Sequence, residues 1–271
     1  MPANITDVDA FTTTVVAPVD GDARNAASVT QGLQPLANRT RLLLNASAGE
    51  LRWSGRLRVG AVGTGLGVYV GPVQSLVIGT SRLSQSGAET EVAGSLPLAG
   101  VSSWYGVYAY DNAGTLALQV SLDARDETGV WKSTGVGTHR YLGSFRTDGS
   151  GNPIAMEAVC GSYRWLTAPA ARTALSTGTS TSAASVACAA YAPPHARLLC
   201  VSTLLHETGG AGNGVGSLGQ TTSGAVLAQL RSPTSGNATQ SLDLPCTSAQ
   251  AISYSVNSYS ELSLYVDGWR E

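Results

Sequence analysis

Residues 104–122 read WYGVYAYDNAGTLALQVSL, and this stretch decides the fold class. Apolar or aromatic residues alternate with small or polar ones on both sides of a polar break, which is the pattern of half-buried β-strands. The break at 111–114, Asp-Asn-Ala-Gly, is composed of turn-forming residues. The sequence therefore predicts an antiparallel hairpin with strands over 104–110 and 115–122.

The same two-residue period continues upstream of this hairpin. Leu57 and Val59 occupy alternate positions in LRWSGRLRVGA (51–61). The denser apolar run GVYVGPVQSLVIG (67–79) predicts two short strands bent at Gly71-Pro72.

A second hairpin is predicted downstream, in YLGSFRTDGSGNPIAMEAV (141–159). Its turn falls at 148–152, where glycine, serine, aspartate and asparagine gather. Pro153 opens the return strand, and proline cannot donate a hydrogen bond to a neighbouring strand. We therefore expect the return strand at the edge of a sheet.

The second half of the chain is also rich in short strand patterns. The Ala/Ser/Thr-rich stretch at 167–186 is interpreted as a boundary or as a first polar strand. Five further strand-like segments follow: RLLCVSTLLHE (197–207), GAVLAQLRS (224–232), TQSLDLPC (239–246), AISYSVNSYS (251–260) and ELSLYVDGW (261–269).

Many short strands with glycine-rich connections favour packed antiparallel sheets over alternating strands and helices. With 271 residues, the chain is long enough for two domains that each have a core. The sequence therefore predicts a mainly β protein with two antiparallel β-sandwich, jelly-roll-like domains over 50–166 and 167–271, preceded by an N-terminal segment over 1–49.

The N-terminal segment contains PVDGDARNAASVTQGLQPLANRTRLLLN (18–45), which has a helical period. Asp22 can cap a helix. Because Pro35 interrupts the pattern, two short helices are predicted, over 22–33 and 35–46. Apolar or small residues spaced by three and four form one seam, with Val29, Leu33, Leu36 and Leu43 as the candidate attachment and oligomerisation residues. The seam fits a bundle of three copies or a helix lying on its own β-domain.

Charged residues make up only 13% of the chain, against roughly 25% in a typical soluble domain. The net charge is −2, and the single lysine is Lys132. Neither this balance nor any basic run indicates a nucleic-acid partner or a membrane-surface patch. No segment approaches about 18 consecutive apolar residues, so no membrane insertion is expected. The N-terminus also lacks the pattern of a secretory signal.

No catalytic, cofactor-binding or metal site is predicted. The histidines are His139, His195 and His206, and a GxSxG nucleophile motif is absent. The cysteines lack CxxC spacing and a nearby histidine pair, so no zinc is expected, and without a secretory signal we expect buried thiols. The motif DGSGN at 148–152 lacks the carboxylates of a calcium loop.

Two further features resemble binding sites. The glycines in GVGSLG (214–219) fit GxGxxG, but a strand-like segment follows where the dinucleotide motif needs a helix. We therefore interpret this motif as a long hairpin loop. Among the aromatic residues, Tyr105 and Tyr163 could face a ligand, although core packing is the simpler interpretation.

Several motifs, in this order along the chain, resemble tailed-bacteriophage fibre and baseplate-associated proteins. The Asp-Gly-Asp step at 20–22, with the Leu-Ala-Asn-Arg-Thr box at 36–40, resembles their N-terminal attachment segment. The two hairpins at 104–122 and 141–154 are similar to hairpins of such proteins, and the end ISYSVNSYSELSLYVDGW (252–269) resembles their terminal strand pair. Pro35 departs from the pattern of a continuous helix.

The resemblance implies a virion structural protein that is homotrimeric, contacts other virion proteins and contributes to attachment and host-surface recognition, with a surface glycan as the expected host ligand. Such a chain would fold in the infected cell's cytoplasm and leave it within the virion. A capsid-attached fibre or decoration protein is the close variant. The remaining alternatives are a lectin-like carbohydrate-binding module and a hydrolase.

Overall fold

The computed structural model describes residues 56–62, 65–79, 81–85, 90–92, 98–209 and 212–271. In these ranges the chain forms antiparallel strands and two short 3₁₀ turns, which confirms the mainly β prediction. The helices predicted over 22–33 and 35–46 lie outside the described residues, as do the candidate attachment residues Val29, Leu33, Leu36 and Leu43.

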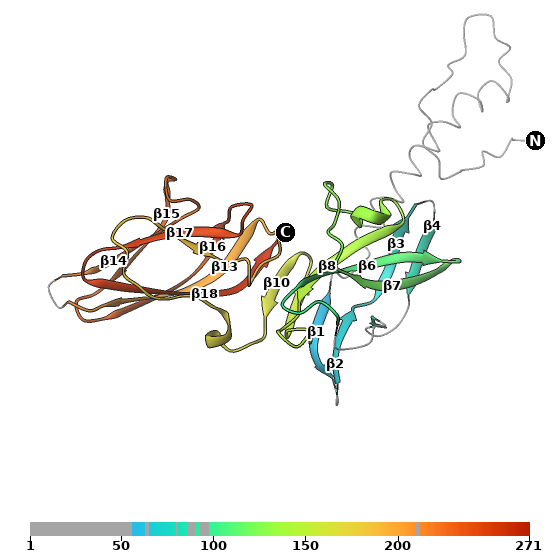
Figure 1. The fold of residues 1–271 in the computed structure, drawn as a ribbon, viewed down its shortest axis with the longest axis horizontal. Coiled ribbons are helices and arrows are strands. Elements are labelled where there is room, and N and C mark those ends of the chain that lie inside the picture. Colours follow the sequence, from blue (N-terminus) through green and yellow to red (C-terminus); the bar gives the residue numbers. More distant parts are fainter. Residues whose placement is uncertain (1–55, 63–64, 80, 86–89, 93–97, 210–211) are drawn as a thin grey trace, which may run out of the picture.

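Figure 1 shows two lobes of strands, which we call the first and the second lobe. The first lobe contains β1 (Leu57–Val62), β2 (Gly65–Val70), β3 (Val73–Ile78), β4 (Ser81–Gln85), β5 (Thr90–Glu91), β6 (Trp104–Asn112), β7 (Thr115–Ser121), η1 (Ser133–Gly135), β8 (His139–Arg146), β9 (Met156–Val159) and β10 (Ser162–Trp165). The second lobe contains η2 (Pro169–Arg172), β11 (Thr173–Gly178), β12 (Ala184–Ala187), β13 (Leu198–Glu207), β14 (Gly214–Gly219), β15 (Val226–Ser232), β16 (Asn237–Pro245), β17 (Ala251–Val256) and β18 (Ser260–Arg270).

The hairpin predicted over 104–122 is confirmed as β6 and β7, and its turn is shorter than expected. Asn112 pairs with Thr115, so the turn consists of Ala113 and Gly114 alone. Both have positive φ, 52° and 87°, which is the geometry of the type I′ turn that suits the twist of paired strands. The backbone N–H of Gly114 also donates to the Asp111 carboxylate over 2.7 Å.

The turn of the second predicted hairpin is confirmed, but its return strand is not. The Asp148 carboxylate accepts hydrogen bonds from the backbone N–H groups of Ser150 and Asn152. After the bridge between Thr147 and Pro153 and one further backbone hydrogen bond, from the Ile154 N–H to the Arg146 carbonyl, the chain leaves β8. The next strand, β9, pairs with β1 and β10, so it lies inside a sheet and not at the edge.

In the second lobe, a four-stranded sheet lies against part of a larger one. The small sheet has the order β12-β17-β14-β15, and its strands contact β13 and β18 of the large sheet. Alternate residues of β13 point into the space between the sheets, where Leu199, Val201 and Leu205 are buried. Leu262 and Leu264 of β18 are fully buried in the same core.

The interpretation of 214–219 as a hairpin loop is wrong, because these residues form β14, between β15 and β17. The glycines serve close packing: a Cβ at Gly216 would lie 3.0 Å from Cδ1 of Leu205 on β13. The 167–186 stretch likewise forms structure, namely η2, β11 and β12, and β11 pairs with β18 as a polar strand.

The two lobes share one sheet, because β18 of the second lobe pairs with β10 of the first. At this junction the Trp269 ring is fully buried and stacks on Tyr163 with a centroid distance of 4.6 Å. The rings of Trp104 and Trp165 close around Trp269 at 5.2 and 5.3 Å. Tyr163 and Tyr105 are both buried, so these tyrosines belong to the core and do not face a ligand.

A connecting segment over 189–195, which we call the strap, adds a second link between the lobes. Its backbone carbonyls accept hydrogen bonds from side chains rather than from a neighbouring strand. Four donors come from the first lobe: Trp104 Nε1 to Ala189, Arg146 Nη1 to Ala190, Trp165 Nε1 to Tyr191 and Arg125 Nη2 to His195. Gln250 of the second lobe donates to Pro194 over 2.8 Å. The strap therefore fixes the lobes to each other through side chains of both.

Candidate binding groove

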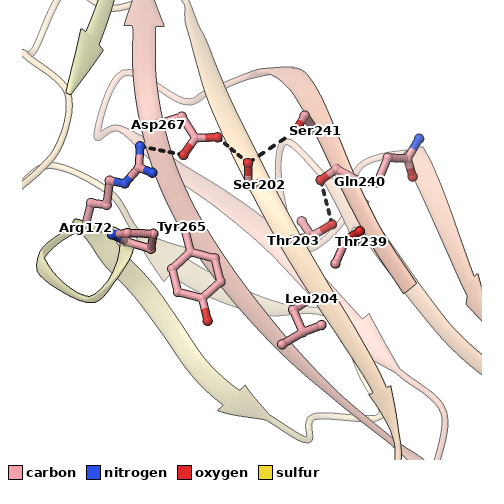
Figure 2. A pocket seen from close by; sticks show the side chains of 10 residues that line it. Arg172, Ser202, Thr203, Leu204, Thr239, Gln240, Ser241, Tyr265 and Asp267 are labelled. Carbon is pink, nitrogen blue, oxygen red and sulfur yellow. Dashed lines mark hydrogen bonds and ion pairs between the residues drawn. The ribbon is translucent and has the colours of Figure 1, made fainter. Parts of the chain in front are cut away.

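A groove of about 420 Å³ lies on the outer face of β13, β16 and β18, and η2 forms one of its walls. Figure 2 shows its side chains. Its position follows from strand alternation: Thr203 and Leu205 point into the core, so Ser202 and Leu204 point outward into the groove.

Two rows of side chains cross the three strands. The polar row consists of Asp267 on β18, Ser202 on β13 and Ser241 on β16 (Figure 2). Beside it, Tyr265 and Leu204 form a more apolar row with Thr239 at its end. The register places these side chains on one face, since Ser202 pairs with Ser241 on one side and with Tyr265 on the other.

An arginine–carboxylate pair closes one end of the groove. Arg172, the last residue of η2, places Nη1 2.7 Å from Oδ1 of Asp267. The Ser202 hydroxyl donates to the other Asp267 oxygen and lies 3.3 Å from the Ser241 hydroxyl. The Asp267 carboxylate is thus oriented from both sides by charge-assisted contacts, which are stronger than neutral hydrogen bonds.

The lining indicates binding chemistry. Hydroxyl groups, one carboxylate and one guanidinium offer hydrogen bonds, while Tyr265 and Leu204 offer apolar contact. The arrangement can therefore orient a polar ligand.

A second polar cluster lies at the junction of the lobes and has a different character. The Glu271 carboxylate accepts a hydrogen bond from the Tyr141 hydroxyl over 2.7 Å and contacts His195 Nε2 at 2.9 Å. Arg125 Nη1 lies 3.2 Å from the other Glu271 oxygen. A cavity of about 600 Å³ borders this cluster, but the charged groups of the cluster already pair with one another. The junction cluster is therefore a link between the lobes.

The ionisation of Glu271 reflects this pairing. Burial alone would raise the pKa of its carboxyl group, but the hydrogen bonds from His195 and Tyr141, together with the His195 and Arg125 charges, outweigh burial. The pKa of Glu271 therefore lies below its ordinary value. Burial raises the pKa of the Tyr141 phenol well above the usual range, so its hydroxyl stays a donor.

The histidines considered in the sequence each have their own surroundings. His195 belongs to the junction cluster, His206 Nδ1 lies 2.6 Å from Asn237 Oδ1, and His139 stacks on Tyr110. Within the described ranges, no three histidine, cysteine or acidic side chains gather as a metal site would require. The helices found there are too short to span a bilayer.

The prediction of buried thiols is confirmed for two of the four cysteines. Cys188 and Cys246 are buried, whereas Cys200 is half-buried and Cys160 is exposed. Burial raises the pKa of the Cys188 thiol to about 12 and that of Cys200 to about 11. Both therefore remain protonated and poorly reactive at neutral pH.

Sequence reasoning did not single out the groove. A signal existed in ELSLYVDGW (261–269), where Tyr265 and Asp267 occupy the outward positions of an alternating strand. No local pattern indicates that Arg172 would reach Asp267, because η2 is a short turn in an Ala/Ser/Thr-rich stretch.

Comparison with known proteins finds no protein-family model and no curated protein that matches this chain.

Proposed function

We propose that the protein is a non-enzymatic structural component of a tailed-phage virion, a homotrimeric tail fibre or baseplate appendage that contributes to attachment and host-surface recognition. In this proposal, residues 1–49 form a helical mount that contacts other virion proteins. Residues 50–166 and 167–271 form two antiparallel β-sandwich, jelly-roll-like domains. A capsid-attached fibre or decoration protein is the close variant.

The observation that carries the proposal is the fixed connection between the lobes. An appendage that presents a surface to a host has to hold its outer part in a defined orientation. Here the pairing of β10 with β18, the buried Trp269 ring and the strap all link the lobes. Domains joined only by a flexible linker would instead move relative to each other.

The low charge of the chain supports the same proposal. With 13% charged residues, the protein has few charges that would have to lose water when it packs against neighbours. On the edge strand β15, Val226 and Leu227 are exposed. Such a surface suits a protein that assembles.

Sedimentation of the full chain tests the assembly. We expect a trimer, and we expect the double substitution Leu33→Glu and Leu36→Glu to yield monomers, because charge in a helical seam opposes its burial. Gln31→Glu, outside the seam, is the matched control and should remain trimeric. A wild-type chain that sediments as a compact monomer would contradict the proposal.

A lectin-like carbohydrate-binding module is the second candidate function. The groove favours it, since hydroxyl groups, an arginine–carboxylate pair and a tyrosine line the same surface. The two functions are compatible, because a virion appendage can carry a binding module.

A further inference from the structure

We infer that the groove over β13, β16 and β18 binds a neutral saccharide, with Asp267 and Arg172 as the polar anchors and Tyr265 with Leu204 as the apolar floor. The inference rests on the recognition role proposed above and assigns that role to a particular surface. It is carried by the arrangement of the side chains that line the groove.

The two rows of the groove match the two kinds of surface on a sugar ring. A pyranose has C–H groups on its faces and hydroxyl groups around its rim. Tyr265 and Leu204 both line the groove and can contact the C–H face. The polar row of Asp267, Ser202 and Ser241 runs alongside, where it can meet the rim hydroxyls.

The polar anchors are oriented before a ligand arrives. Arg172 and Ser202 hold one Asp267 oxygen each, and each carboxylate oxygen can accept a further hydrogen bond. Two neighbouring sugar hydroxyls could therefore donate to the one carboxylate. Since Arg172 is 15% exposed and Asp267 23%, little side-chain freedom remains to be lost on binding.

Charge balance selects a neutral ligand. Among the described residues that line the groove, the charged ones are Arg172 and Asp267, and they form an ion pair. Their charges cancel, so the lining carries no excess positive charge to attract a phosphate, a sulfate or a sugar acid. The volume of about 420 Å³ is toward the small end of the range of about 300 to 1,000 Å³ for small-molecule pockets, which suits a short oligosaccharide.

The experiment uses the full chain on an array that carries neutral oligosaccharides beside their sialylated and sulfated counterparts. We expect retention by at least one class of neutral glycan and no stronger retention by its acidic counterparts. The dissociation constant for the best neutral glycan is then measured by calorimetry. Retention by acidic glycans alone, or by none, would overturn the inference.

Groove variants locate the binding. Tyr265→Ala and Asp267→Asn should each raise the dissociation constant about tenfold, since each removes one contact or charged acceptor. Ser241→Tyr should block the groove by adding bulk at an exposed position, so it tests the site even where Tyr265→Ala perturbs folding. The matched control is Tyr259→Ala, which removes a tyrosine that is 43% exposed in the turn before β18 and should change nothing.

These results separate this inference from the proposed virion role. If the protein is a trimer that binds no neutral glycan, or if its glycan binding is unchanged in all three groove variants, the saccharide inference is contradicted. The proposed structural role in the virion is unaffected by that result. If the protein is a monomer and its glycan binding depends on the groove, the proposed trimeric virion role is contradicted and the saccharide inference is supported.

Discussion

Two arginine–carboxylate pairs of similar composition serve different regions of the molecule. At the junction, Arg125 pairs with Glu271, and their side chains are 15% and 9% exposed. In the groove, Arg172 pairs with Asp267, and their side chains are 15% and 23% exposed. The arginines are equally covered, so the difference lies in what surrounds the carboxylates.

The Glu271 carboxylate is surrounded by protein partners, whereas the Asp267 carboxylate faces a groove. Tyr141 and His195 complete the contacts of Glu271, while the second Asp267 oxygen accepts from Ser202. Removing one partner of an enclosed pair leaves a buried charge unpaired, but water can compensate at an open pair. The comparison indicates that the junction pair contributes stability and that the groove pair is available to a ligand.

The largest expected effect comes from the junction core. Trp269→Ala should lower the free energy of unfolding by about 3 to 5 kcal/mol, because it leaves a cavity among Tyr163, Trp104 and Trp165. Urea unfolding followed by circular dichroism measures it. Tyr265→Phe, on the same strand but in the groove, is the control and should stay within about 0.5 kcal/mol of wild type. A loss below about 1 kcal/mol for Trp269→Ala would show that the junction is not tightly packed.

The next effect comes from the enclosed ion pair. Glu271→Gln should destabilise the protein by about 3 kcal/mol, because it removes an enclosed carboxylate charge that Arg125, His195 and Tyr141 all contact. The same urea titration measures the change. Equal losses in Glu271→Gln and Asp267→Asn would contradict the distinction between the enclosed pair and the open pair.

The contribution of Glu271 should also depend on pH. Its pKa in the folded protein is below the ordinary value of 4.5, so folding favours the ionised carboxylate. The Glu271 carboxylate therefore contributes its full stability when the pH is above the ordinary pKa. This contribution is lost as the pH falls through the lower pKa of the folded protein. The difference in unfolding free energy between wild type and Glu271→Gln should therefore shrink as the pH falls below this ordinary value. A difference that stays constant as the pH is lowered would contradict the conclusion that the pKa of Glu271 is lowered in the folded protein.

The smallest effect on stability is expected in the groove. Asp267→Asn should cost no more than about 1 kcal/mol, because the pair is partly open to solvent and the amide can still accept from Ser202. Thermal unfolding of this variant beside wild type measures the change. A cost comparable to that of Glu271→Gln would mean that the groove pair is a structural element.

The sequence predicts those parts of the fold that are encoded locally. The β6–β7 hairpin is marked by alternation and by turn residues within a few positions of each other, and the bend at Gly71-Pro72 is marked in the same way. By contrast, β14 was missed because its glycines serve contact with a strand of another sheet, which no local pattern reveals.

Neither ion pair could be predicted from a local sequence pattern. Arg125 and Glu271 are separated by 146 positions, and their meeting depends on β18 reaching the first lobe. Arg172 meets Asp267 only because η2 packs against β18. The strand patterns therefore predict which side chains face outward, while the assembly of a site depends on tertiary contacts between elements.

The pairing of β10 with β18 has a consequence for biogenesis. On the ribosome, the sheet of the first lobe stays incomplete until residues 260–270 have emerged, so this lobe cannot mature ahead of the second. A fragment that stops before β18 would leave one side of β10 unpaired, and exposed strand edges promote aggregation. Expression strategies that divide the chain between β10 and β11 would therefore yield insoluble material, whereas an intact chain protects that edge as it folds.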